Sequence, residues 1–154
     1  MITEQNFQIR KANDIDLQVI VDFQLKMAWE TEQLKLDESV LRKGVESLLK
    51  NPERGYYWIV EENKIPVACM LILYEWSDWR NGNVLWIHSL YVAESHRHRG
   101  IFKMLYARLK DMVSNHPSWK GIRLYVEKSN HLAKKAYEKV GLTSDHYEMF
   151  EWLK

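Results

Sequence analysis

The sequence has one cysteine, three prolines and no long uninterrupted apolar run. Cys69 stands alone within an apolar segment, which excludes an intramolecular disulfide and predicts a small buried hydrophobic residue rather than a nucleophile. The longest apolar run, Val67 to Tyr74, is far shorter than the ~20 residues that span a bilayer. The N-terminal MITEQNFQIR lacks the apolar segment of a signal peptide. We therefore expect a cytoplasmic protein with no membrane partner.

The charge balance, the lack of a P-loop motif and the isolated pair of histidines argue against several further classes of ligand. Lys and Arg number 22 against 21 Asp and Glu, and the only short basic cluster is His96–Arg99, so no nucleic-acid footprint is indicated. The G-x-x-x-x-G-K-[ST] pattern of a P-loop is absent. His96 and His98 lack a cysteine or a third nearby ligand, so no metal site is expected. A small-molecule ligand is favoured.

The apolar and aromatic content indicates a single globular domain over residues 1–154. Apolar residues make up 46% of the chain, with seven Trp and eight Tyr, which is enough for a sizeable core. Apolar periodicity predicts an α/β (α+β) order of elements. The expected strands are 7–10, 56–61, 67–74, 84–92, 122–126 and 146–153, and the expected helices are 13–29, 37–51, 102–113 and 130–140. The strand–helix–strand order around 102–113 predicts one parallel pair in a mostly antiparallel, mixed sheet.

The stretch 90–108, LYVAESHRHRGIFKMLYAR, reads as a strand, a polar turn and a helix start. The first N–H groups of that helix and its dipole make an anion site, and Gly100 lets a ligand approach the backbone closely. Arg97, Arg99 and Lys103 add positive charge, which favours a diphosphate. The alternative is a helix start with solvated basic residues.

The run Arg97-His98-Arg99-Gly100-Ile101-Phe102 resembles the Q/R-x-x-G-x-G/A signature of the GCN5-related N-acetyltransferases, the GNAT superfamily. The resemblance implies that the turn cradles the pyrophosphate of acetyl-CoA. Leu90-Tyr91-Val92 resembles the end of the family's fourth strand, which pairs with the pantetheine arm. Phe102 departs from the family's Gly or Ala. It either crowds the diphosphate or packs in the core, and its helical spacing to Leu105 and Tyr106 favours the core.

A second segment, Asn130-x-x-Ala133-x-x-x-Tyr137-x-x-x-Gly141-Leu142, is similar to the family's N-x-x-A-x-x-x-Y-x-x-x-G-F pattern. The resemblance implies that Asn130 binds the cofactor and that Tyr137 is the general acid for the departing thiolate. Proton transfer from a phenol to a thiolate costs about 2 kcal/mol, which suits that role. The alternative is that Tyr137 only packs in the core, at helical spacing from Ala133.

The catalytic base is expected at His88, which aligns with the position where many family members carry a glutamate. Histidine has a pKa suited to accepting a proton near neutral pH, directly or through water. A backbone N–H near Leu90 or Tyr91 would polarise the thioester carbonyl. The alternative is that His88 is an ordinary polar residue of a strand.

The acceptor is expected to contact the loop 75–82, where carboxylates and indole rings would suit a cationic amine. The segment YEWSDWRNG resembles, loosely, the corresponding loop of diamine acetyltransferases, which implies a polyamine-like acceptor. These residues are also ordinary loop anchors. The expected acceptor-binding residues are Glu75, Trp76, Asp78 and Trp79, with Glu30 and Glu32 as weaker candidates.

Taken together, the resemblance implies a GNAT fold: a mixed sheet of six to seven strands, about four flanking helices, and a V-shaped splay between the fourth and fifth strands. The implied activity is direct transfer of an acetyl group from acetyl-CoA to a primary amine of a small molecule or peptide. The alternative is a non-catalytic acyl-CoA-binding sensor, which Phe102 and the missing strand glutamate keep open. The sequence leaves a homodimer open.

Overall fold

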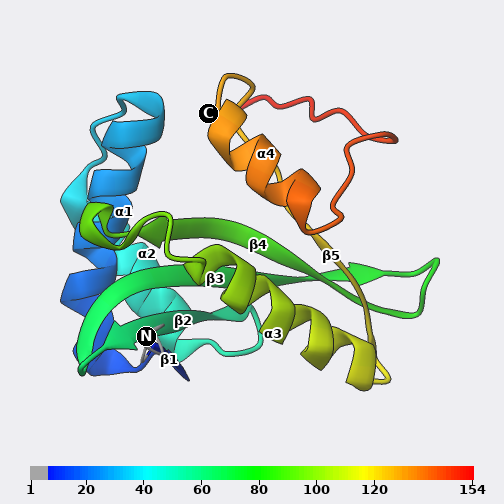
Figure 1. Ribbon diagram of the computed structural model, residues 1–154, viewed down its shortest axis with the longest axis horizontal. Helices are drawn as coiled ribbons and strands as arrows, with labels where there is room; N and C mark the ends of the chain where they lie inside the picture. The colour runs from blue at the N-terminus through cyan, green and yellow to red at the C-terminus, as the bar shows by residue number, and fades with distance from the viewer. Residues whose placement is uncertain (1–6) are drawn as a thin grey trace, which may run out of the picture.

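A computed structural model describes residues 7–154, so the N-terminal segment considered above for a signal peptide lies partly outside the described residues. One five-stranded sheet and four α-helices make up the fold (Figure 1). The strands are β1 (Phe7–Lys11), β2 (Gly55–Glu62), β3 (Ile65–Ser77), β4 (Gly82–Val92) and β5 (Trp119–Arg123). The helices are α1 (Leu17–Glu32), α2 (Glu38–Lys50), α3 (Ile101–Asn115) and α4 (His131–Lys139), with short 3-10 turns η1 (Asp14–Asp16) and η2 (Glu94–His96).

The strands lie in chain order, β1-β2-β3-β4-β5. The first four pair antiparallel, and β5 pairs parallel with β4 because α3 crosses over between them. The prediction of a mixed, mostly antiparallel sheet with four helices is confirmed. The predicted number of six to seven strands is wrong for residues 7–154, which form five.

The missing strand is the one expected over 146–153. Residues 141–154 contain no strand, and the side chains of Tyr147, Phe150 and Trp152 are 73%, 91% and 86% exposed. The apolar residues of this segment fall at both odd and even positions. A strand built from it would therefore have no single apolar face to place against a core.

Two other boundaries differ from the prediction. The expected loop 75–82 is mostly hairpin, because β3 continues to Ser77 and the turn occupies only 78–81. The expected strand 122–126 lies instead at 119–123, since pairing begins where Asn83 pairs with Trp119. The β4–β5 register then ends at Trp86 and Arg123, and Figure 1 shows the chain after β5 running away from β4 toward α4.

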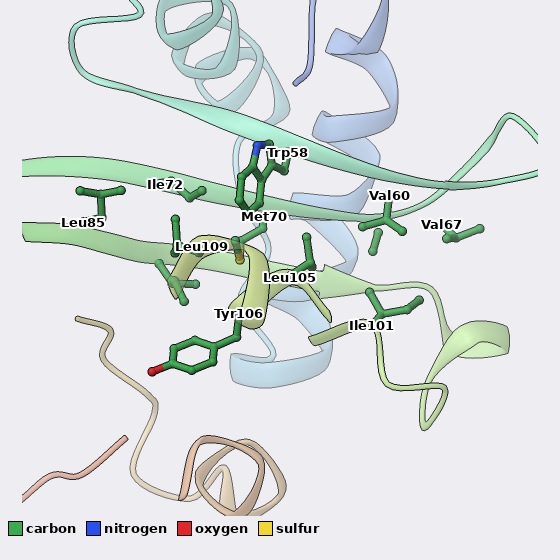
Figure 2. Packing of buried hydrophobic residues seen from close by; sticks show 12 residues of the cluster. Trp58, Val60, Val67, Met70, Ile72, Leu85, Ile101, Leu105, Tyr106 and Leu109 are labelled. Carbon is green, nitrogen blue, oxygen red and sulfur yellow. The ribbon is translucent and has the colours of Figure 1, made fainter. Parts of the chain in front are cut away.

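Alternation along the strands sends side chains to two apolar clusters, one on each face of the sheet. On one face, Trp58 and Met70 pack against Leu105 and Leu109 of α3 (Figure 2). On the other face, residues of α1 and α2 cover the sheet, and fully buried Cys69 belongs to this cluster. Burial raises the pKa of the Cys69 thiol to about 12, so it behaves as a hydrophobic residue.

The ends of the helices are determined by capping hydrogen bonds and by residue preferences close to them in the sequence. Asp37 Oδ1 accepts the backbone N–H groups of Ser39 and Val40, which caps α2 as expected. That helix ends at Lys50, two residues before Pro52, because the residue that precedes a proline disfavours helical geometry. No helix within residues 7–154 is long and apolar enough to cross a membrane.

Candidate functional site

The separation of β4 from β5 leaves one edge of β4 open. Pairing with β5 stops at Trp86, so within the described residues the part of β4 from 87 to 92 has a strand neighbour only at β3. Leu90 and Val92 turn toward the α3 cluster, whereas Tyr91 is buried on the opposite face against Phe23, at 5.0 Å between ring centroids. An extended ligand would therefore meet backbone groups at this edge.

Beyond β4, the chain turns through residues 93–100 into α3. His98 and Gly100 both adopt left-handed backbone conformations, with φ of 61° and 77°. The backbone N–H of Arg97 bonds to the Glu94 carbonyl, and the next bonded one is that of Met104, to the Gly100 carbonyl. Within residues 7–154, the N–H groups of 98–103 have no acceptor. Such consecutive free donors at a helix N-terminus make an anion-binding concavity.

Gly100 is favoured here by its backbone conformation, because residues that carry a Cβ rarely adopt positive φ. A Cβ added at Gly100 would meet no atom of residues 7–154 within 4 Å other than those of its two chain neighbours, so this side of the turn is open in the described part of the chain. Ile101 begins α3 and is buried at 2% exposure, which anchors the helix start to the sheet.

The three basic residues of the turn differ in what they contact. Arg97 donates from Nε to the Val92 carbonyl at 3.0 Å and from Nη2 to the Glu30 carboxylate. Arg99 binds the Glu62 carboxylate through both terminal nitrogens. Lys103 is exposed on the first turn of α3. Lys103 is thus the residue of the three whose charge faces solvent.

The ring of Phe102, on α3, contacts a tyrosine of α4. This ring lies 6.0 Å from Tyr106 and 5.2 Å, edge to face, from Tyr137. Burial raises the pKa of Tyr137, so the hydroxyl stays protonated at neutral pH. Asn130 is the N-cap of α4, where its Oδ1 accepts the Ala133 N–H at 3.1 Å.

His88 occupies a β-bulge. Leu71 faces Ser89 and the next residue, Ile72, faces Ile87, so His88 is the extra residue without a cross-strand partner. His88 keeps an exposed side, but partial desolvation by its surroundings lowers the pKa of its imidazole, which favours the neutral ring at pH 7. A neutral ring at a bulge on an open strand edge is able to accept a proton.

Tyr125 was not among the site residues expected from the sequence, but its hydroxyl lies 3.3 Å from Nε2 of His88, with ring centroids 5.9 Å apart. Tyr125 follows β5, and β5 is parallel to β4. The carboxyl ends of parallel neighbouring strands lie at the same edge of a sheet. A tyrosine just past the end of β5 could therefore have been predicted from the sequence to lie near His88.

The residues expected to bind the acceptor do not form one cluster. Glu75 accepts from Trp86 Nε1 and lies 3.4 Å from Arg123 Nη1, so its charge is already paired. Asp78 and Trp79 lie in the hairpin turn, which at ~3.4 Å per residue is about 20 Å from His88 along β4. The exposed fractions of the two indoles are 62% for Trp76 and 87% for Trp79.

Residues 20–142 match the model of the acetyltransferase (GNAT) family. A solved structure described as a possible acetyltransferase from Clostridium difficile 630 is 41% identical, with a TM-score of 0.90 over 96% of this chain and 97% of that chain. No curated protein matches the sequence.

Two more distant structures share the fold. An aminoglycoside N-acetyltransferase in complex with CoA is 15% identical, with a TM-score of 0.78 over 100% of this chain and 99% of that one. A ribosomal-protein-alanine N-acetyltransferase from Brucella melitensis biovar Abortus 2308 is 16% identical, with a TM-score of 0.76 over 96% and 99%. Proteins named for different acceptors thus share this architecture.

Proposed function

This chain belongs to the acetyltransferase (GNAT) family, and from that premise we propose that it transfers an acetyl group from acetyl-CoA to a primary amine. The proposal is supported chiefly by the N–H groups of 98–103, which have no acceptor among residues 7–154, next to the edge of β4 that β5 leaves open. A diphosphate fits the first feature and an extended amide-bearing arm fits the second.

The residues present fit acetyl-CoA. The N–H groups of the turn and the Lys103 ammonium would hold the diphosphate, and the backbone of 90–92 would hold the pantetheine arm. Asn130 would add its side-chain amide, since only its Oδ1 is engaged as the helix cap. Bound acetyl-CoA supplies an acetyl group activated as a thioester.

The chain's own residues would move the protons. The His88 imidazole would accept a proton from the attacking amine, while its Nε2 lies 3.3 Å from the Tyr125 hydroxyl. Tyr137 Oη donates a proton to the departing sulfur as the C–S bond breaks and the C–N bond forms. The amine attacks in its neutral form, so an ammonium ion first loses one proton to solvent. His88 then gains one proton and Tyr137 gives one up, the two residues are restored by exchange with solvent, and no covalent enzyme intermediate is required.

The acceptor that we propose is a cationic primary amine, either a polyamine-like small molecule or a peptide amine. Burial is the main reason that the pKa of Tyr125 is raised, and the carboxylates of Glu151 and Glu32 add to it. Two negative charges therefore act on the hydroxyl that contacts His88. A cation beside this pair would be stabilised by both carboxylates.

Thermal unfolding with acetyl-CoA, and with ATP and NAD as controls, tests the cofactor half. Ligand at 100 times its dissociation constant stabilises by about 2.7 kcal/mol, which shifts the midpoint by several degrees. Release of CoA thiol in the presence of a panel of amines then tests transfer. No shift with acetyl-CoA overturns the proposal, and a shift without thiol release on any amine supports the non-catalytic sensor instead.

A further inference from the structure

Glu62, the last residue of β2, is bound to two residues of the turn that precedes α3. Its carboxylate accepts from Arg99 Nη1 at 3.1 Å, again from Arg99 Nη2, and from His96 Nε2 at 3.0 Å. The three side chains are partly buried, at 22%, 31% and 19% exposure for Glu62, Arg99 and His96. One carboxylate from the sheet therefore holds both sides of the turn.

The partners of Glu62 are themselves fixed. The other nitrogen of His96 lies 2.7 Å from the Ser95 hydroxyl, so both ring nitrogens are engaged. The Arg99 guanidinium lies over the ring of Phe7, 4.8 Å from its centroid, and Phe7 is the residue that pairs with Glu62 across β1 and β2. The carboxylate is thus part of the sheet, and the sheet orients the turn.

We propose that Glu62 is a positioning residue for the diphosphate of acetyl-CoA, and that Arg99 braces the turn rather than binding the ligand. This inference rests on the proposed function, because it concerns the same binding turn. The planar guanidinium of Arg99 donates two hydrogen bonds to the Glu62 carboxylate, so two of its donors are already engaged. Direct contact with the diphosphate then falls to the backbone N–H groups, to Lys103 and, where its bond to Glu30 opens, to Arg97.

The physical reason lies in the backbone of the turn. His98 is a non-glycine residue in the left-handed region, between the two residues that Glu62 holds. Such a conformation persists only where the surroundings fix it. Donors already aimed at the ligand lose little conformational entropy on binding, so the affinity for a diphosphate depends on this bracing.

The substitution Glu62→Gln tests the proposal, because it keeps the shape of the side chain and removes its charge. Loss of charge-assisted bonds that orient the turn is expected to raise the dissociation constant for acetyl-CoA about 10-fold in isothermal titration. Turnover at saturating acetyl-CoA should change less than about twofold, since no reacting atom is touched. The effect should therefore appear in KM for acetyl-CoA and not in kcat.

Glu61→Gln is the matched control. Glu61 is the neighbouring residue of β2 and loses an equivalent ion pair, to Arg10 at 2.7 Å, which does not involve the turn. Both variants should unfold at lower temperature than the unchanged chain, but Glu61→Gln should bind acetyl-CoA with unchanged affinity. A further variant, Glu62→Asp, retains the charge on a shorter side chain and should recover part of the affinity.

The affinity of Glu62→Gln for acetyl-CoA can also contradict the inference. If Arg99 were a diphosphate ligand that Glu62 holds back, Glu62→Gln would bind acetyl-CoA more tightly. Unchanged or tighter binding in Glu62→Gln overturns the inference while leaving the proposed function intact. If the unchanged chain itself fails to bind acetyl-CoA, the proposed function fails, and this inference fails with it.

Discussion

The hydroxyl of Tyr125 lies 3.3 Å from Nε2 of His88, and this contact joins the segment after β5 to the bulge of β4. It forms two residues past the last paired positions of the two strands, Trp86 and Arg123. The bulge is what brings the imidazole to this point, because an unbulged strand would give His88 a cross-strand partner on β3. The candidate base thus stands where the strands separate.

The first prediction concerns the pH dependence of acetyl transfer. Burial holds the pKa of His88 below its ordinary value of about 6.5, so the basic, neutral form persists to lower pH. The ratio kcat/KM for the amine should therefore fall on the acid side with an apparent pKa below 6.5. His88→Gln should lower kcat/KM roughly 100-fold and abolish that acid limb.

Tyr125→Phe is the control for this prediction, since it removes the hydroxyl and leaves the imidazole. The acid limb should remain in that variant. The same shift makes the free energy of unfolding rise with pH between the folded pKa of His88 and its ordinary value, because the unfolded chain binds more protons there. An acid limb that survives in His88→Gln would show that another group is the base.

The second prediction separates acid catalysis from packing at Tyr137. Tyr137→Phe keeps the ring that meets Phe102 and removes only the hydroxyl, whose proton burial retains at neutral pH. Turnover should fall roughly 100-fold with the dissociation constant for acetyl-CoA nearly unchanged. Tyr106→Phe, which also touches Phe102 but from α3, should leave turnover unaffected. Equal turnover in Tyr137→Phe would make Tyr137 a packing residue.

The third prediction concerns Gly100, which has φ of 77° and open space beside it. Gly100→Glu places a carboxylate where an anion is proposed to bind, so calorimetric titration should detect no acetyl-CoA binding. Gly100→Ala should lower the free energy of unfolding by about 1 kcal/mol, because a Cβ is strained at this φ even without a clash. Detectable binding by Gly100→Glu at unchanged affinity would remove the turn from the diphosphate site.

Much of this fold was predictable because its signals are local. The helical stripe after Gly100, the cap at Asp37 and the stop before Pro52 each act within a few residues, and each lies where the sequence placed it. The hairpin of β2 and β3 and the parallel β5 likewise follow from the order of apolar runs. Local chemistry thus accounts for most helix ends and for the topology.

The side-chain pairing within the site was not predictable in the same way. Glu62 and Arg99 are 37 residues apart, and Glu75 and Arg123 are 48 apart, so only the folded sheet brings them together. The bulge at His88 depends on the register with β3, which no single strand encodes. Long-range register therefore decides which charges stay free for a ligand.

The last prediction concerns Glu30, whose carboxylate binds Arg97 Nη2 from the end of α1. Arg97 keeps its orientation without Glu30, because its Nε also donates to the Val92 carbonyl at 3.0 Å. Glu30→Gln should therefore leave the guanidinium in place and remove a carboxylate that competes with an incoming diphosphate. An exposed pair of this kind is worth up to about 1 kcal/mol, so acetyl-CoA should bind up to about fivefold more tightly.

The salt dependence of acetyl-CoA binding distinguishes competition for Arg97 from a change in the shape of the turn. Both side chains are more than a third exposed, so the gain in Glu30→Gln over the unchanged chain should shrink between 50 mM and 500 mM salt as charge interactions are screened. Glu46→Gln is a suitable control, because Glu46 loses an exposed ion pair to Lys50, at 2.6 Å on α2, that does not involve the turn. Weaker binding in Glu30→Gln would mean that Glu30 orients Arg97 for the ligand, and the competition would be ruled out.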